Sequence, residues 1–217
     1  MKIFRYSVCL HRLEIHQLEL LRYWRNNRYI SRYMEYQEFI TEDMQKVWFK
    51  KIDNINNFFF IIEYNKSAIG LINTADIDYN KKTADTGLFV WEEQYLNSHI
   101  PTLASLAMLD IFFKLFGIET VKAKVKNDNY KAIAYNEALG FELSEVNQKS
   151  GFDKYILHAN RYFKDNKQLR KTAISLYKNN TDIYLKENDN ISKEFLNILK
   201  GTSDEYQQEL NLLLHYY

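Results

Sequence analysis

The spacing of apolar residues divides the first part of the chain into one strand and three helices. Residues 3–10 alternate weakly between apolar and polar side chains, which is typical of a strand. Leucine and tryptophan recur at helical spacing through residues 12–26, and a short second helix is predicted over 28–34. Thr41 is a residue type that caps helices, and the apolar face after it predicts a helix ending near residue 53. That face consists of Met44, Val47, Trp48 and Ile52.

The middle of the chain has the pattern of consecutive strands. Stretches rich in β-branched and aromatic residues occupy 58–64, 69–77 and 83–91. Short polar turns, Asn65-Lys66 and Asn80-Lys81, separate them. Because such turns join neighbouring strands, we expect an antiparallel meander.

A strongly apolar helix and a further β-rich stretch follow the meander. The helix is predicted over 101–116, since proline is accepted at a first helical position and Gly117 suits a C-terminal stop. Residues 120–125 then predict a strand that can lie parallel to strand 83–91. Ligands commonly bind outside the carboxyl ends of strands in such a unit, so we expect the site at its mouth.

The remaining elements before residue 160 are a helix and two strands. The helix is predicted over 129–138, with Gly140 after it, and the strands lie near 141–146 and 153–159. The order of elements predicts an α/β (α+β) fold: a mixed, mostly antiparallel sheet of six to seven strands, flanked by helices.

The composition changes after the last of these strands, where valine and tryptophan are absent. Helical patterns are predicted over 161–178, 191–200 and 203–215. Since roughly 55 residues make only a marginal core, we expect a helical C-terminal extension (161–217) attached to a main domain (1–160). Its apolar stripes must pack on that domain or on a second subunit, which leaves a homodimer through the C-terminal helices open. The stripes consist of Phe195, Leu196, Leu199, Leu210, Leu213 and Leu214.

Composition and charge exclude several classes of protein. Of the 217 residues 46% are apolar and the net charge is +1, so the chain can bury a sizeable core and global disorder is excluded. A charge this small gives no field that would hold a polyanion, which argues against a nucleic-acid partner. No apolar run approaches the roughly 18 residues of a membrane span, and no secretory signal pattern is present. We expect a cytoplasmic protein without a membrane partner.

Cysteine and histidine are too sparse for a metal centre. Cys9 is the single cysteine and lies in an apolar stretch, so we expect it in the core. His11 and His16 form the one close histidine pair, and a five-residue gap fits neither helical nor strand spacing of metal ligands. We expect no metal.

Residues 127–141 carry the most specific motif. Their order and spacing resemble the last conserved block of the GNAT superfamily of acyl-CoA-dependent N-acetyltransferases. Further upstream, Trp24-Arg25-Asn26, Tyr33-Met34 and Phe39-Ile40-Thr41 resemble the branch that acetylates nucleotide-linked amino sugars, such as the pseudaminic-acid pathway enzymes. The resemblance covers about residues 5–160. The residues in register with the conserved block are Asn129, Ala132, Ile133, Glu137, Gly140 and Phe141.

This resemblance implies a function and a co-substrate. An acetyl group would pass from acetyl-CoA directly to a primary amine, in this branch the amine of a small nucleotide-linked amino sugar. The pantetheine arm would lie in a splay between the fourth and fifth strands, and the diphosphate above the N-terminus of helix 101–116. The residues implied in cofactor binding are Phe89, Val90, Trp91, Leu96, Asn97, Ser98, His99, Ile100, Thr102 and Asn129.

The pyrophosphate loop departs from the family pattern. Its small residues fall on His99 and Pro101. A histidine adds a side chain where glycine would allow close approach, and proline lacks an N–H for a phosphate oxygen. The side chains of Asn97, Ser98 and His99 could act as donors instead. The loop therefore predicts altered CoA binding, and a catalytically silent GNAT-fold interaction protein is the alternative from a different class.

The resemblance also implies catalytic positions. Asn136 stands where the family has a tyrosine that protonates the thiolate; an amide cannot supply that proton, so water would, with Asn136 bonded to the sulfur. Asp85 is the candidate base, and it could equally be a solvated turn residue. Arg25 and Asn26 are candidates for a substrate phosphate or hydroxyl, and Asn73 for a polar substrate contact. Acetylation of a protein N-terminus or side-chain amine remains a further alternative.

Overall fold

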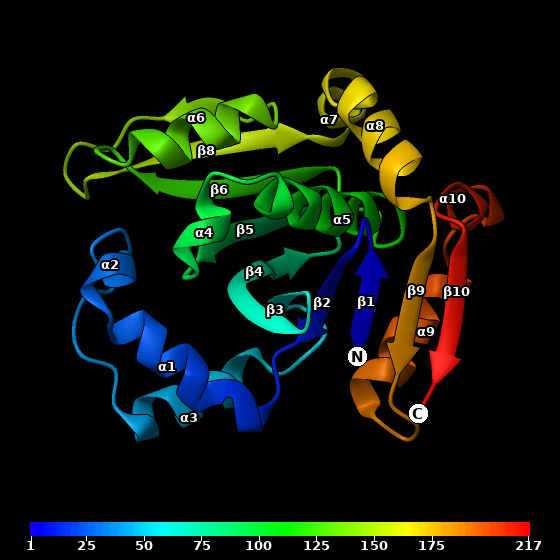
Figure 1. The fold of residues 1–217 in the computed structure, drawn as a ribbon, viewed down its shortest axis with the longest axis horizontal. Coiled ribbons are helices and arrows are strands. Elements are labelled where there is room, and N and C mark those ends of the chain that lie inside the picture. Colours follow the sequence, from blue (N-terminus) through cyan, green and yellow to red (C-terminus); the bar gives the residue numbers. More distant parts are fainter.

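The computed structural model describes residues 1–217, and a ten-stranded sheet runs through the whole molecule (Figure 1). Its order is β10-β9-β1-β2-β3-β4-β5-β6-β8-β7, with β5–β6 and β9–β10 as the parallel pairs. The mixed, mostly antiparallel class is confirmed, but the sheet has more strands than predicted. The strands are β1 (Lys2–Arg5), β2 (Val8–Arg12), β3 (Phe58–Tyr64), β4 (Ser67–Asp78), β5 (Thr83–Val90), β6 (Thr120–Lys126), β7 (Glu142–Glu145), β8 (Phe152–His158), β9 (Thr181–Leu185) and β10 (Leu212–Tyr216).

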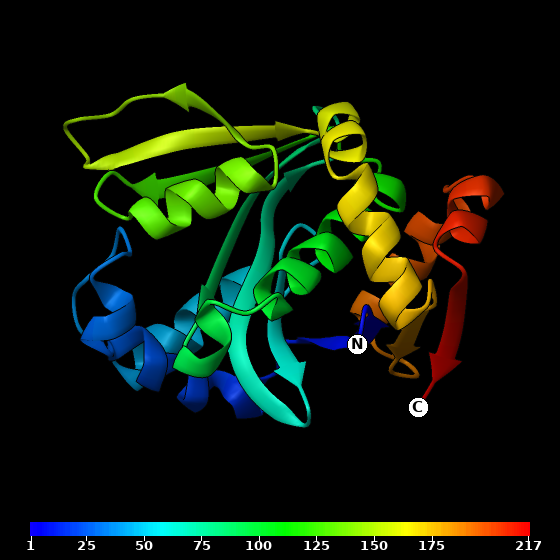
Figure 2. The same cartoon turned by 45° about the horizontal axis from the view of Figure 1, so that its top comes forward.

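Helices cover both faces of the sheet, as the two views show (Figures 1 and 2). Side chains of β3 alternate between the faces, as in any strand. Phe58 and Phe60 belong to the core shared with α5, whereas Ile61 packs in a second cluster with α1. The helices are α1 (Leu18–Asn26), α2 (Arg28–Ser31), α3 (Glu42–Ile52), α4 (Glu93–Leu96), α5 (Ile100–Lys114), α6 (Tyr130–Ala138), α7 (Ala159–Asp165), α8 (Lys167–Tyr177), α9 (Asn190–Lys200) and α10 (Asp204–Glu209).

Residues 3–10, which were predicted as one strand, belong to a hairpin of two strands. β1 and β2 pair in antiparallel register, and the turn between them places Tyr6 and Ser7 at φ values of 51° and 63°. Neither residue type signals such a turn, which usually uses glycine or asparagine. The cost of this backbone is offset by burial of the Tyr6 ring and by its hydroxyl bond to Asp110 (2.8 Å), a contact far away in the sequence.

The third helix has the predicted cap but not the predicted buried face. The Thr41 hydroxyl accepts from the backbone N–H of Met44 at 3.2 Å, as expected for an N-cap residue. However, Val47 is exposed, and the buried residue of the helix is Gln45. Trp48 lies half-buried against Phe59. Met44 and Trp48 of this helix therefore line a cavity, and Val47 faces solvent.

The C-terminal extension is not entirely helical, contrary to the prediction. β9 pairs with β1, and β10 lies parallel to β9, so residues 181–185 and 212–216 extend the main sheet. The predicted helix over 203–215 ends at Glu209, because Leu212–Tyr216 gains a strand partner that no local pattern indicates. Predicted helix 161–178 is two helices, α7 and α8. Three residues of the predicted stripes join the main core: Phe195, Leu199 and Leu210.

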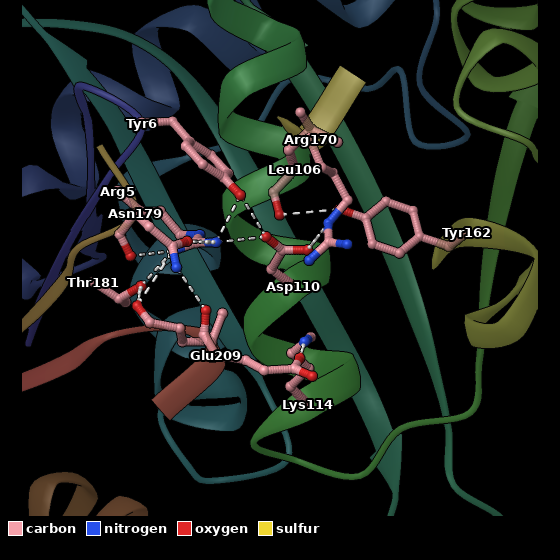
Figure 3. Close-up of polar contacts among 11 residues, drawn as sticks. Arg5, Tyr6, Leu106, Asp110, Lys114, Tyr162, Arg170, Asn179, Thr181 and Glu209 are labelled. Carbon is pink, nitrogen blue, oxygen red and sulfur yellow. Dashed lines mark hydrogen bonds and ion pairs between the residues drawn. The ribbon is translucent and has the colours of Figure 1, made fainter. Parts of the chain in front are cut away.

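The extension covers α5, which is buried along almost its whole length. In its middle lies the fully buried Asp110 carboxylate, whose two oxygens accept from side chains of both ends of the chain (Figure 3). Oδ2 accepts from Arg5 and Tyr6 at 2.9 and 2.8 Å, and Oδ1 accepts from Tyr162 and Arg170 at 3.0 and 2.7 Å. Proximity to this carboxylate and burial raise the pKa of both tyrosines.

The structure also bears on the predictions for Cys9, for a metal site and for a membrane span. Cys9 is buried and free, as expected, and burial raises the pKa of its thiol to about 12. No group of three or more His, Cys, Asp or Glu side chains is arranged to hold a metal ion. None of the helices combines the length and apolar character needed to cross a membrane.

Candidate active site

β5 and β6 run parallel for three residue pairs and then separate. Their register pairs Thr83 with Thr120, Ala84 with Val121 and Asp85 with Lys122. Beyond that point β5 continues to Val90, paired with β4 alone. Backbone groups on its other edge therefore have no partner strand, and a long polar ligand can bind there as an additional strand does.

A cavity of about 1180 Å³ lies over this separation. Residues 86–90 of β5 and 123–126 of β6 both line it, so the two diverging strands form its base. One wall comes from α1, α2, α3 and the chain between them; the opposite wall comes from α5 and α6. The cavity is thus long enough to contact two different helical layers, and the strand edge lies between them (Figure 1).

The α6 wall begins with Asn129, whose side chain accepts from the backbone N–H of Ala132 at 3.3 Å and caps the helix. Two turns further along the helix, Asn136 also lines the cavity. Its amide nitrogen donates to the carbonyl of Ala132 at 2.8 Å, which leaves one amide hydrogen and the amide oxygen for a ligand.

Tyr135 joins α6 to the first turns of α5. Its hydroxyl donates to the Pro101 carbonyl at 2.9 Å and lies 2.7 Å from the Ser105 hydroxyl. The side chain packs between the two helices, and burial raises the pKa of its hydroxyl. All three residues line the cavity.

The altered pyrophosphate loop leaves the cavity open. The predicted loop forms the short helix α4, and His99 points outwards, where Nε2 lies 2.8 Å from the Tyr177 hydroxyl on α8. Ser98 uses its hydroxyl within the loop, donating to Tyr95 and accepting from Ile100. The imidazole therefore lies outside the cleft, and Pro101 forms part of the cavity wall.

The α1 wall carries Arg25, one helical turn beyond Leu21 on the same face, and both line the cavity. Opposite them on the sheet, Asn73 of β4 lies beside Gly87 of β5; a side-chain carbon at position 87 would approach Asn73 Oδ1 to 3.0 Å. Glycine at this position therefore gives the Asn73 amide room to lie across β5. Tyr29, Tyr33 and Tyr36 line the same wall.

Two predicted polar residues lie outside the cavity wall. The Asn26 amide exchanges two hydrogen bonds with the backbone of Ile40, at 2.9 and 2.8 Å, so it holds the loop after α2. Asp85 stands at the last paired position before the strands separate, half-buried and next to the lining residue Thr86. Burial is the main cause that raises its pKa, followed by the nearby carboxylate of Asp76.

The cavity brings together about half of the predicted site residues. Of the proposed cofactor positions, Trp91 stacks on Trp24 and donates its backbone N–H to Ile69, so it is not available to a ligand. Ser98, His99, Ile100 and Thr102 also do not line the cavity. The predicted residues that do line it are Arg25, Asn73, Phe89, Val90, Leu96, Asn97, Asn129 and Asn136.

The sequence analysis missed several lining residues. Met44 and Trp48 were assigned to the apolar face of a helix, and the cationic residues were not considered. A signal was present for α3, since a glutamine lies within its apolar face. No local signal marks the others, because they converge through tertiary packing alone. The missed residues are Arg32, Met44, Gln45, Trp48, Phe59, Ser105, Lys124, Lys126, Lys131 and Tyr135.

These features together are those of an acyltransferase that binds a long thioester between two diverging strands. Residues 7–142 match the family model of the acetyltransferase (GNAT) domain, and the chain belongs to this family. It is therefore an N-acetyltransferase, with acetyl-CoA as its co-substrate.

Known relatives agree with this family. A spermidine N(1)-acetyltransferase from Vibrio cholerae is 27% identical over 139 residues, which are 62% of this chain and 79% of that protein. Among solved structures, the spermidine N-acetyltransferase from Vibrio cholerae in complex with CoA and spermine has a TM-score of 0.64 at 22% identity, covering 72% of this chain and 98% of that one. A domain from Methanocaldococcus jannaschii has a TM-score of 0.61 at 20% identity, covering 70% and 97%. The structural likenesses establish the fold.

The residues present fit acetyl-CoA. The free edge of β5 offers backbone groups to the amides of the pantetheine arm, and the cavity over it has a volume of about 1180 Å³. Near the N-terminus of α5, Asn97 supplies a polar side chain to the wall, and Lys131 on α6 supplies a positive charge without an ion-pair partner.

Proposed function

We propose that the cavity holds acetyl-CoA along the edge of β5 and an acceptor amine against the α1–α3 wall. The co-substrate supplies the thioester carbonyl that the amine attacks. What supports this is the separation of β5 from β6 within a cavity that reaches both helical layers. Cofactor contacts are proposed for Phe89, Val90, Leu96, Asn97 and Asn129, and acceptor contacts for Arg25 and Asn73.

The neutral acceptor amine attacks the thioester carbonyl, and the proton that its nitrogen loses must leave the cavity through water. No carboxylate lines the cavity, and Asp85 is the acidic residue at the apex of the strand separation. We propose that Asp85 accepts this proton through a water bridge. Its raised pKa makes it a stronger base than an exposed aspartate.

Asn136 is proposed to stabilise the departing thiolate. Its second amide hydrogen can bond the sulfur, while the first stays on the Ala132 carbonyl. Because an amide carries no transferable proton at neutral pH, water then protonates the sulfur. An Asn136→Ala variant should lower kcat without changing the KM for acetyl-CoA, since the bond forms as the charge develops.

Two classes of acceptor amine are suggested by two different observations, the N-terminal motifs and the comparison with known proteins. The N-terminal motifs resemble enzymes that acetylate nucleotide-linked amino sugars, and the relatives found by comparison are named for spermidine. A peptide with a free N-terminus represents the third class. All three are compared by release of the CoA thiol at equal acceptor concentration.

Binding of acetyl-CoA tests the proposal before any acceptor is known. A ligand that binds the native state stabilises it by about 2.7 kcal/mol at a hundredfold excess over Kd. Thermal unfolding should therefore shift upwards with acetyl-CoA. Val90→Glu places a carboxylate in the base of the cavity and should abolish the shift, whereas Val47→Glu, on the exposed side of α3, should leave it intact. No shift at millimolar acetyl-CoA would contradict the proposal.

We propose that a homodimer forms through the edge of the sheet and not through the apolar stripes of the C-terminal extension. The predicted helical stripes pack mainly on the chain itself, so they do not offer an interface. β10 is an edge strand with Leu213, Leu214 and Tyr216 exposed, and we propose this edge as the contact between two copies. Light scattering of the protein and of Leu213→Lys, which places a charge on that edge, tests it: a monomer in both samples would contradict it.

A further inference from the structure

Arg25 is half-buried and has no partner. No hydrogen bond or ion pair forms at its guanidinium, and burial alone lowers its pKa, with no carboxylate close enough to oppose the effect. The other arginines that are buried or half-buried each pair with a carboxylate. These pairs are Arg5–Asp110, Arg12–Asp53, Arg22–Glu19, Arg161–Glu142 and Arg170–Asp110.

An unpaired guanidinium in such a place is unfavourable for the free protein. Arginine is rarely buried unless it is paired, because removing the charge from water is costly. Arg25 lines the cavity, so a ligand can provide the missing partner. Its planar fork of N–H donors matches the two oxygens of a carboxylate or a phosphate.

The rest of the cavity wall has the same sign of charge. Arg32 also lines the cavity, on the same wall as Arg25. Its guanidinium lies over the rings of Tyr29 and Tyr33 and has no carboxylate partner. No aspartate or glutamate lines the cavity. Glu35, outside it, pairs with Lys124.

We propose that the acceptor is an amine whose molecule also carries a phosphate or carboxylate group, and that Arg25 binds this anionic group. The inference rests on the proposed function of the cavity and narrows its substrate class. A polyamine such as spermidine would meet only positive charge on this wall and is disfavoured. The aromatic residues that share the wall suit a ring or an apolar body between the amine and the anion.

This arrangement also assists the reaction. The attacking amine must be neutral, and positive charges beside it lower the pKa of its ammonium form. Arg25 therefore positions the anionic group, and the other cations that line the cavity, such as Arg32 and Lys124, favour the nucleophilic form of the amine.

The first experiment is a binding measurement that needs no knowledge of the natural acceptor. The protein is saturated with CoA, so that the phosphate sites of the co-substrate are filled, and its thermal unfolding is followed with inorganic phosphate or acetate against chloride at equal ionic strength. We expect at least one of the two anions to raise the midpoint. Arg25→Gln should abolish this shift, and Arg28→Gln, an exposed arginine outside the cavity, should retain it.

The second experiment compares acceptors in matched pairs. Glucosamine 6-phosphate against glucosamine tests the phosphate, and γ-aminobutyrate against butylamine tests the carboxylate. The anionic member should have the higher kcat/KM, and Arg25→Gln should reduce that advantage by about 10- to 100-fold, the strength of a charge-assisted hydrogen bond. Where neither pair reacts, the anionic members should still inhibit or stabilise the protein through Arg25.

The outcomes separate the two proposals. Loss of acetyl-CoA binding would refute the proposed function of the cavity. Retained acetyl-CoA binding, with no effect of either anion on the CoA complex, would refute the anionic acceptor alone. A preference for spermidine that persists in Arg25→Gln would refute it as well.

Discussion

The His99 imidazole and the Tyr177 hydroxyl form a hydrogen bond of 2.8 Å between the α4–α5 loop and α8, with their rings nearly parallel. In this arrangement the His99 ring lies outside the cavity. The contact is also a direct link between the co-substrate loop and the C-terminal extension.

Replacing His99 with alanine should leave acetyl-CoA binding nearly unchanged. The ring lies outside the cavity, and a single exposed hydrogen bond contributes about 1 kcal/mol or less. The KM for acetyl-CoA should stay within about threefold of the parent value, and Tyr177→Phe should behave in the same way. A rise of tenfold or more in His99→Ala alone would mean that the imidazole contacts the co-substrate.

Replacing Asp110 with asparagine should destabilise the protein strongly. Its carboxylate is the shared partner of Arg5 and Arg170, and both guanidinium groups would lose their counter-charge in a buried site. Breaking such a pair costs about 3–5 kcal/mol in the free energy of unfolding. Urea denaturation measures it. Asp128→Asn, at the exposed pair with Lys126, serves as the control, with an expected change of about 1 kcal/mol or less.

A chain that ends at residue 160 should not fold. It would lose Arg170 and Tyr162 from the Asp110 site, the partner strand of β1, and the cover over α5. Circular dichroism and hydrogen exchange of this shortened chain measure the effect. A cooperative unfolding transition in it would show that residues 1–160 form an independent domain.

Replacing Asp85 with asparagine should affect both rate and stability. If Asp85 accepts the substrate proton, kcat should fall by about 100-fold. Burial raises its pKa in the folded protein, so the folded carboxyl binds its proton more tightly than the unfolded one. The free energy of unfolding therefore falls as pH rises through these two pKa values, starting near pH ~4.

The stability gain of Asp85→Asn should accordingly be present at neutral pH and vanish below pH ~4. Unfolding curves at both pH values measure this gain independently of activity. Unchanged turnover, together with the predicted stability gain, would leave Asp85 as a half-buried aspartate without a catalytic role.

Replacing Arg25 with glutamine should not destabilise the protein. Its guanidinium has no bond to lose, so the free energy of unfolding should rise or stay within about 0.5 kcal/mol. Arg12→Gln is the matched control, because Arg12 bonds Asp53 and two backbone carbonyls, and roughly 2–4 kcal/mol should be lost. A large loss in Arg25→Gln would indicate a structural role instead of a binding role.

The sequence by itself determined the meander, the α5 crossover and the family. The runs of β-branched and aromatic residues along β3 and β5, and the motif from Asn129 to Phe141, depend on local sequence alone. The helix start at Thr41 was predicted correctly for the same reason, because a cap residue forms its hydrogen bond within the first turn of its own helix.

Only the tertiary structure decided the hairpin at Tyr6, the strands β9 and β10, and the charge of the acceptor wall. The hairpin is held by Asp110, β9 by β1, and the unpaired state of Arg25 follows from which carboxylates lie far from it. These features depend on partners distant in sequence, whose meeting is set by packing of the whole chain. The local conformational preference of a segment does not depend on such distant partners and therefore cannot predict them.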